Sequence, residues 1–230
     1  MIRAVIFDLD GTLVETEPLH LVAFNDALRP DGIEIVSDDY FKRLIGYDDR
    51  DCFTTVLREH GIAPSEDRIA ALIARKTAIY QAIIAERDVL YDGAEQFVRA
   101  SAARFPLIIA TGTLRVEAEA ILRRAKLREF FLDIIAADDV EHGKPAPDGM
   151  LLALGRIGFM LRQRDPVMPY ECLVIEDTPA GIEAAHRAGM KVLAICHTAT
   201  AADLANADVV RPSIRGLDLD DILRALLGAS

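Results

Sequence analysis

The sequence alternates short apolar runs with segments of helical length, and this alternation restricts the fold more than any other feature. The apolar runs are rich in Val and Ile and fall at residues 4–7, 107–110, 132–136, 173–175, 192–195 and 208–210. Each run is typical of a strand buried on both faces. Helix-length segments such as 115–125, 148–155 and 181–188 lie between most of them. The pattern predicts an α/β fold with a doubly wound, mainly parallel sheet that helices cover on both faces.

One long segment departs from this alternation. Residues 15–88 contain no strand-like run, and their apolar residues recur at helical spacing in 20–28, 52–57 and 69–84. Turn residues, among them Pro30-Asp31-Gly32, separate these stretches. We therefore expect an α/β core formed by residues 1–14 and 89–230, with an inserted all-α helical cap domain at residues 15–88.

Composition and charge exclude several classes of protein. The length of 230 residues suits one domain with a smaller insert, and the net charge of −11 argues against nucleic acid and anionic membranes as partners. No apolar run approaches bilayer length and no signal peptide is evident, so we expect a cytoplasmic protein. The spacing of the three cysteines suggests neither disulfides nor a metal site and predicts buried, reduced thiols: Cys52, Cys172 and Cys196.

The first predicted strand leads directly into two carboxylates. The segment Phe7-Asp8-Leu9-Asp10-Gly11-Thr12 follows it, and the two-residue period of a strand allows Asp8 and Asp10 to point to one side. In open α/β sheets, ligands bind at the carboxyl ends of the strands. One carboxylate there could attack a substrate while the other transfers a proton. Taken alone, the segment could equally be an Asp-rich turn.

The next two strands also end in residues that suit phosphate chemistry. Thr111 follows the strand at 107–110, and its hydroxyl and the N–H groups of neighbours such as Gly112 could hold a phosphoryl oxygen. A simple helix cap is the alternative for Thr111, and the two roles are compatible. Lys144 follows the third strand between a glycine and two prolines, where a rigidly held ammonium would bind phosphate, although a lone loop lysine is more often only solvated.

Glu176 and Asp177 follow the fourth strand and add two more carboxylates at this edge. Favourable placement of acids near a helix N-terminus is the alternative explanation. Four carboxylates gathered at one edge would repel one another and call for a cation. Ligands that are all oxygen favour Mg²⁺, while the five histidines show no metal-ligand spacing and argue against zinc: His20, His60, His142, His186 and His197. We therefore predict a Mg²⁺ site formed by Asp8, Asp10, Glu176 and Asp177.

These segments, taken in order, resemble the four motifs of the haloacid dehalogenase superfamily. The resemblance covers essentially the whole chain and includes Gly-Lys-Pro-Ala-Pro-Asp from Gly143 and Glu-Asp-Thr-Pro-Ala-Gly from Glu176. It implies that Asp8 is a nucleophile that becomes an aspartyl-phosphate, that Asp10 is the general acid and base, and that Thr111 and Lys144 bind the phosphoryl group. It also implies that Mg²⁺ is held by the Asp8 and Asp177 carboxylates and the Asp10 backbone carbonyl, with Glu176 beside it. Members that cleave carbon–halogen bonds lack the second acid of the first motif, so Asp10 favours phosphate chemistry.

The helical insert is similar to the small cap of the subfamily that contains β-phosphoglucomutase and many sugar-phosphate phosphatases. Four residues fall near cap positions that meet substrate in that group: His20, Gly46, Arg50 and Lys76. The spacing between Gly46 and Arg50 is one residue longer than in the mutases, which separates Arg50 from that pattern. For Arg50 and Lys76, a solvated helix face is an equal alternative.

The second motif distinguishes between the reactions of this subfamily. Gly112 stands where the mutases tend to carry a small polar residue, which favours hydrolysis of a small phosphorylated metabolite over a mutase reaction. A phosphosugar mutase resembling β-phosphoglucomutase is the alternative enzyme. A binding module with a vestigial site is the non-enzyme alternative, although such a chain would be expected to have lost one of the motif residues. The oligomeric state is not readable from the sequence.

Overall fold

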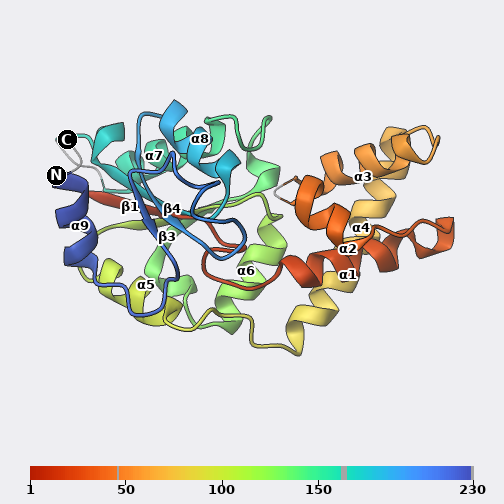
Figure 1. Cartoon of the computed structure of the whole chain (residues 1–230), viewed down its shortest axis with the longest axis horizontal. Helices are drawn as coiled ribbons and strands as arrows, with labels where there is room; N and C mark the ends of the chain where they lie inside the picture. The colour runs from red at the N-terminus through yellow and green to blue at the C-terminus, as the bar shows by residue number, and fades with distance from the viewer. Residues whose placement is uncertain (46, 162–164, 229–230) are drawn as a thin grey trace. The chain divides into compact units, whose positions relative to one another are not determined.

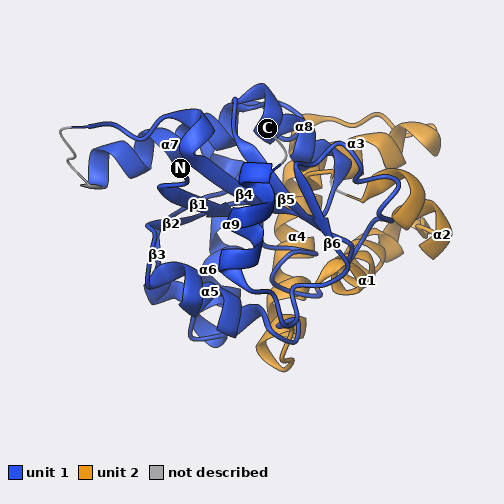
Figure 2. Ribbon diagram, turned by 60° about the vertical axis from the view of Figure 1, so that its left-hand side comes forward, with its two compact units in different colours: residues 1–15, 90–230 blue, residues 16–89 orange. Residues whose placement is uncertain are grey.

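The computed structural model describes residues 1–45, 47–161 and 165–228 (Figure 1). The chain divides into two compact units, one formed by Met1–Glu15 with Leu90–Ser230 and the other by Thr16–Val89 (Figure 2). The larger unit contains the sheet. The smaller unit is helical within its described residues. Gly46, one of the predicted substrate residues, lies outside the described residues.

The larger unit is built on a six-stranded sheet in which every pair of neighbouring strands is parallel. Its order is β3-β2-β1-β4-β5-β6, which confirms the predicted α/β fold with a doubly wound sheet. The strands are β1 (Ala4–Phe7), β2 (Leu107–Ala110), β3 (Phe131–Ile135), β4 (Cys172–Glu176), β5 (Lys191–Ile195) and β6 (Val209–Arg211). The helices of this unit are α5 (Ala94–Ala102), α6 (Arg115–Arg124), α7 (Asp148–Leu161), α8 (Pro179–Arg187) and α9 (Leu219–Gly228).

Alternate strand residues cover the two faces of the sheet. On one face, Ile6, Ile108 and Val174 pack with Ile157 of α7 and Ile182 of α8 in a single buried cluster. On the other face, the ring of Phe7 packs edge-on against Phe97 of α5, with ring centroids 6.0 Å apart. Apolar residues on both sides of each strand explain why the strands read as continuous apolar runs in the sequence.

The register of the central strands brings three strand ends to the same edge. Phe7 of β1 pairs with Ile109 of β2 and with Ile175 of β4. The residues that follow these partners therefore emerge side by side at the carboxyl edge. The strand order reverses between β1 and β4, and in folds of this type ligands bind at such a switch point.

Helix α7 extends beyond the sequence-based expectation. The apolar pattern predicts a helix that ends at residue 155. In the structure α7 continues through Gly155 and Gly158 to Leu161, because Ile157 extends its buried face. α6 begins at Arg115, where the sequence pattern places the start of this helix, and its N-cap is Leu114, so Thr111 is not the helix cap. Propensity alone does not end a helix whose apolar face continues to bury surface.

The smaller unit contains α1 (Glu17–Leu28), α2 (Ser37–Asp39), α3 (Asp49–Glu59) and α4 (Glu66–Ala85). Phe24, Phe53, Leu57 and Leu72 belong to its own buried cluster. Side chains cap the N-termini of two of its helices. Ser65 caps α4, and Asp48 caps α3 by accepting a hydrogen bond from the N–H of Asp51. This unit therefore has its own apolar core.

No helix in the described ranges combines the length and the apolar character that a bilayer-spanning helix needs. The three cysteines are free. Cys52 and Cys172 are buried as expected, whereas Cys196 is partly exposed, contrary to expectation.

Candidate active site

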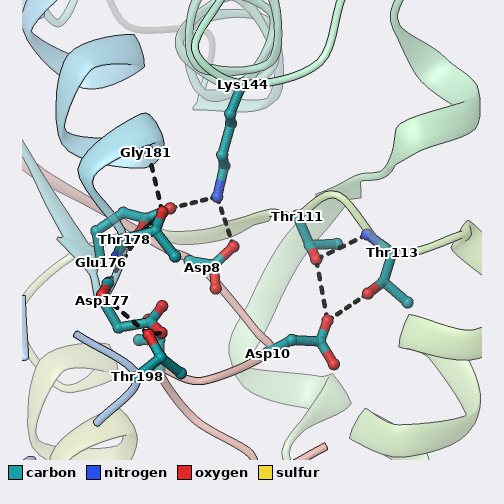
Figure 3. Close-up of polar contacts among 11 residues, drawn as sticks. Asp8, Asp10, Thr111, Thr113, Lys144, Glu176, Asp177, Thr178, Gly181 and Thr198 are labelled. Atoms are coloured by element: carbon teal, nitrogen blue, oxygen red, sulfur yellow. Dashed lines mark hydrogen bonds and ion pairs between the residues drawn. The ribbon is translucent and has the colours of Figure 1, made fainter. Parts of the chain in front are cut away.

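A partly buried lysine joins two acidic strand ends at the carboxyl edge of the sheet. Lys144, whose peptide bond to Pro145 is cis, places its Nζ 2.5 Å from Oδ1 of Asp8, the residue after β1. The same ammonium is hydrogen-bonded to Oε1 of Glu176, the last residue of β4 (Figure 3). Because β1 and β4 are neighbours, the two carboxylates face the same ammonium. The first, third and fourth motif segments therefore meet at one point.

Glu176 is anchored at the beginning of α8. Its Oε2 accepts hydrogen bonds from the N–H groups of Asp177 and Thr178, both at 2.8 Å, and from the Thr178 hydroxyl at 2.9 Å. Thr178 also caps α8 by accepting a hydrogen bond from the N–H of Gly181 at 3.1 Å. The helix lies so close that a Cβ on Gly181 would be 1.8 Å from Glu176 Oε1. The Glu176 side chain is thus fixed independently of its contact with Lys144.

Asp177 is held by two threonines from distant parts of the chain. The Thr12 hydroxyl donates to Asp177 Oδ1 at 2.9 Å, and the Thr198 hydroxyl donates to Oδ2. Gly11 packs directly against this carboxylate, and a Cβ on Gly11 would lie 2.1 Å from Asp177 Oδ2. Since Gly11 also has a φ of +77°, a side chain there is excluded both by backbone conformation and by space.

Asp10 faces the second motif. Its Oδ2 accepts a hydrogen bond from the Thr113 hydroxyl and lies 3.4 Å from the Thr111 hydroxyl. Thr111 Oγ1 in turn accepts from the N–H of Thr113 at 3.1 Å. Thr111 and Thr113 are buried, whereas Gly112 between them is exposed. The structure therefore brings Asp10 and Thr111 together, with Gly112 beside them at the surface.

Burial determines the electrostatics of the site. Desolvation raises the pKa of Asp8 well above its usual range, since the nearby Lys144 ammonium only partly offsets it and the charge of Glu176 adds to it. Desolvation also raises the pKa of Asp177, and the neighbouring charges of Glu176 and Asp8 raise it further. For Lys144 the balance is reversed: burial lowers its pKa, but the Asp8 and Glu176 carboxylates outweigh burial and raise it overall. The site thus has three buried carboxyl groups, and the Lys144 ammonium pairs with two of them, Asp8 and Glu176.

The four carboxyl groups predicted to bind metal do not all point to a common centre. No group of three His, Cys, Asp or Glu side chains in the described part of the chain is arranged to hold a metal ion. The two carboxylate oxygens of Glu176 accept hydrogen bonds from Lys144 and from the start of α8, and the Asp10 carboxylate accepts from Thr113. Asp8 and Asp177 are the two carboxyl groups whose buried negative charge a cation would relieve. Their donor atoms are oxygen, which Mg²⁺ prefers.

The predicted cap residues fall into two environments. His20 stacks on Tyr80 with ring centroids 4.1 Å apart, and Lys76 Nζ lies 4.8 Å from the centre of the same Tyr80 ring. Lys76 is fully buried and forms an ion pair with Asp49 at 3.0 Å. Arg50 is about half exposed and pairs with Glu66 at 2.5 Å. The structure thus groups His20 with Lys76 and places Arg50 in a separate ion pair.

Several hydroxyl side chains that complete this arrangement do not stand out in the sequence. Thr12, Thr113 and Thr198 each donate a hydrogen bond to an acidic residue of the site. Thr198 follows the predicted strand 192–195 by three residues, but that position does not distinguish it from other hydroxyl residues of the same loop, such as Thr200. Thr12 and Thr113 lie within motif segments, but threonine is as common in ordinary turns.

The family model of haloacid dehalogenase-like hydrolases matches residues 2–189 of this chain. The chain belongs to this family. The match spans the four motif segments and agrees with the superfamily resemblance that the motifs predict. It covers well over half of the 230 residues.

Individual relatives of this haloacid dehalogenase-like hydrolase include phosphatases. The fructose-1-phosphate phosphatase YqaB of Escherichia coli is 32% identical over 191 residues, covering 81% of this chain and 92% of the relative. The structure of CbbY from Rhodobacter sphaeroides in complex with phosphate has a TM-score of 0.83 at 31% identity and covers 94% of this chain and 96% of that one. A β-phosphoglucomutase from Clostridium difficile has a TM-score of 0.87 at 23% identity, covering 99% of this chain and 98% of that chain, which is a likeness of fold.

Proposed function

We propose that this hydrolase is a Mg²⁺-dependent phosphatase that hydrolyses a small phosphomonoester, a sugar phosphate or a related metabolite, through an aspartyl-phosphate on Asp8. The main support is the buried arrangement in which the Lys144 ammonium lies 2.5 Å from Asp8 Oδ1 and is fixed by Glu176. A cation beside a buried carboxylate is what attack on an anionic phosphate requires. The similarity to a fructose-1-phosphate phosphatase supports the choice of a sugar phosphate.

In the first half of the reaction, an Asp8 carboxylate oxygen attacks phosphorus and the bond from phosphorus to the substrate oxygen breaks. Asp10 gives its proton to the departing oxygen, which leaves as an alcohol. The Lys144 ammonium neutralises charge that develops on the phosphoryl oxygens, and the Thr111 hydroxyl donates a hydrogen bond to one of them. A hydrogen bond from the Thr113 hydroxyl holds Asp10 in place for this proton transfer.

In the second half, a water attacks phosphorus and the bond to Asp8 breaks. Asp10 now accepts a proton from that water, so inorganic phosphate is released and the Asp8 carboxylate is restored. Each residue ends in the protonation state in which it began. The cycle therefore needs one acid–base group and one nucleophile, and Asp10 and Asp8 supply them.

A divalent cation fits the excess of negative charge at the site. Burial raises the pKa values of Asp8 and Asp177, which marks both carboxyl groups as costly to ionise without a cation. The Asp8 and Asp177 carboxylates and the Asp10 main-chain carbonyl would hold Mg²⁺. When bound, Mg²⁺ supplies charge neutralisation for the phosphoryl group.

The test is a panel of hexose, pentose and three-carbon monophosphates incubated with the pure protein and Mg²⁺, with released phosphate measured. Chelation of Mg²⁺ should abolish release. Asp8→Asn should abolish it as well, because an amide of the same size cannot attack phosphorus. Absence of release by the parent, or equal release by Asp8→Asn, would reject the proposal. Conversion of β-glucose 1-phosphate to glucose 6-phosphate faster than phosphate release, with a bisphosphate primer, would instead indicate a mutase.

A further inference from the structure

The loop after β5 contacts both acidic turns of the site. It begins at Cys196, directly after Ile195 at the end of the strand. His197 contacts the turn after β1, and Thr198 contacts Asp177, the residue after β4. The proposed reaction assigns no role to this loop. Its contacts nevertheless reach the two segments that carry the proposed metal ligands.

The ring of His197 has a defined tautomer. Its Nδ1 lies 2.9 Å from the carbonyl oxygen of Gly11, which can only accept a hydrogen bond, so Nδ1 carries the hydrogen. The N–H of Ile214 donates to Nε2 at 3.4 Å, and the hydroxyl of Ser213 lies 3.4 Å from the same nitrogen. A neutral ring with hydrogen on Nδ1 satisfies these contacts. Burial lowers the pKa of His197, in agreement with a neutral ring.

His197 thereby fixes the turn that contains the first motif. Gly11 stands between Asp10 and Thr12, and its own N–H donates to the carbonyl of Val14 at 2.8 Å. The His197 ring packs on Tyr91 with ring centroids 3.8 Å apart. Tyr91 also donates its N–H to the carbonyl of Leu13 at 3.0 Å. The turn is therefore held at Gly11 by His197 and at Leu13 by Tyr91.

Thr198 fixes the opposite side of the site. Its hydroxyl is hydrogen-bonded to Asp177 Oδ2 and lies 3.1 Å from the Asp177 carbonyl oxygen. Thr12 donates to the other carboxylate oxygen of Asp177 at 2.9 Å. The Thr198 methyl carbon would lie 2.7 Å from a Cβ on Gly11, so this side chain also packs against the first turn. Neighbouring residues of one loop thus restrain both turns.

We propose that His197 and Thr198 are positioning residues that set the separation between the Asp8–Asp10 turn and Asp177, and with it the affinity for Mg²⁺. The proposal rests on the proposed function, because it concerns the same metal ligands. Partners that orient metal ligands typically change metal affinity or activity by about 10–100-fold when they are removed. A purely structural role would change stability and leave metal affinity as it is.

The first experiment measures Mg²⁺ binding by calorimetry on substrate-free protein. Thr198→Val keeps the shape of the side chain but loses the hydroxyl, and we expect about tenfold or more weaker binding. Thr198→Ser restores the hydroxyl and should return the Mg²⁺ affinity to within about threefold of the parent. This loss is smaller than the one expected when a residue that orients a metal ligand is removed. Thr200→Val is the matched control, because the Thr200 hydroxyl in the same loop donates to Asp203 at 2.6 Å.

The second experiment separates the ring of His197 from its hydrogen bond. His197→Phe keeps a ring against Tyr91 and loses the donor to Gly11, and should weaken Mg²⁺ binding by about tenfold. His197→Asn can place an amide N–H near the position of Nδ1 and should lose less. A ¹H–¹⁵N spectrum of the histidine rings should show hydrogen on Nδ1 of His197. Thermal melts establish that each variant is folded.

The outcomes distinguish the two proposals. If the parent binds Mg²⁺ and releases phosphate while folded Thr198→Val and His197→Phe bind Mg²⁺ as the parent does, the positioning role is overturned and the proposed function stands. A hydrogen on Nε2 of His197 would also overturn it. If the parent neither binds Mg²⁺ nor releases phosphate, both proposals fail together.

Discussion

Replacing Gly181 by alanine tests whether the Glu176 carboxylate is a fixed anchor of the site. Gly181 lies inside α8, where alanine is ordinarily more favourable than glycine by about 0.5–1 kcal/mol. The new methyl carbon would lie 1.8 Å from Glu176 Oε1 and 1.9 Å from Glu176 Cδ. Because both distances are far below van der Waals contact, the carboxylate must move away. The substitution should therefore destabilise a helix that it would otherwise stabilise.

The magnitude follows from the contacts that the displaced carboxylate loses. Glu176 Oε2 accepts three hydrogen bonds of 2.8–2.9 Å, and Oε1 is bonded to the Lys144 ammonium. A hydrogen bond to a charged group contributes about 1.5–3 kcal/mol, and partial relaxation keeps some of them. We expect the free energy of unfolding to fall by about 2–4 kcal/mol. Phosphate release should fall with it, because Lys144 loses its anchor.

Gly155→Ala is the matched control. Gly155 lies in the middle of α7 and is exposed, and a methyl group there would have open space around it, with no neighbouring side chain of the described residues within 4 Å. Alanine at this position should raise the free energy of unfolding by about 0.5–1 kcal/mol and leave activity unchanged. Urea unfolding followed by far-UV circular dichroism compares the parent with both variants. A Gly181→Ala protein as stable as Gly155→Ala, with parental activity, would refute the anchoring of Glu176.

Three further predictions concern single side chains. Thr113→Val removes a hydrogen-bond donor to Asp10 and should lower kcat by about tenfold with little change in KM. Thr113→Ser keeps the hydroxyl and should restore kcat. A kcat of Thr113→Val equal to that of the parent would contradict this role. Lys144→Ala leaves buried carboxylates without their cation and should lower the free energy of unfolding by about 3 kcal/mol in Mg²⁺-free buffer, measured by urea unfolding; an unchanged midpoint would count against it. Burial raises the pKa of Asp208, but hydrogen bonds from Lys191, the Val192 N–H and His186 outweigh it, so its pKa is lowered. Asp208 therefore stabilises the fold above the unfolded-state pKa of about 3.9, and this contribution is lost as pH falls through the lower folded-state value. Asp208→Asn should cost about 1 kcal/mol at pH 7 and progressively less in acid, and a pH-independent difference would refute the assignment.

The sheet and the acidic part of the site were predictable because one physical rule connects them. Apolar runs identify buried strands, parallel strands end at the same edge, and the residues after them must therefore lie together. Asp8, Thr111 and Glu176 follow or end three such strands, and the observed register places them side by side. The reasoning needed no side-chain detail.

The direction of each side chain was not predictable in the same way. Glu176 and Asp177 are adjacent acids in the sequence, yet Glu176 turns toward Lys144 and Asp177 toward Thr12 and Thr198. Hydroxyl residues are common in turns and caps, so the sequence alone gives no reason to choose those that contact carboxylates. Only the register and the close approach of the turns select them.

In the smaller unit, the contacts of the charged side chains were likewise not predictable from the sequence. Helical spacing indicates which face of a helix is apolar, but Lys76 and Arg50 both occupy positions that suit solvent or substrate. In the structure Lys76 is buried against Tyr80 and paired with Asp49, whereas Arg50 pairs with Glu66 near the surface. The difference depends on which acid lies within reach of each cation, and helical spacing does not contain that information.

Treating Glu176 as an anchor explains why the four acids do not surround one point. Two like charges about 4 Å apart cost roughly 4 kcal/mol at an effective dielectric of about 20, so each buried acid needs its own compensation. Glu176 obtains it from the start of α8 and from Lys144, and it therefore does not depend on a metal ion. Asp177 accepts from the uncharged hydroxyls of Thr12 and Thr198, and burial still raises its pKa. The proposed divalent cation would thus compensate Asp177 together with Asp8, while Glu176 holds the lysine beside Asp8, the proposed nucleophile.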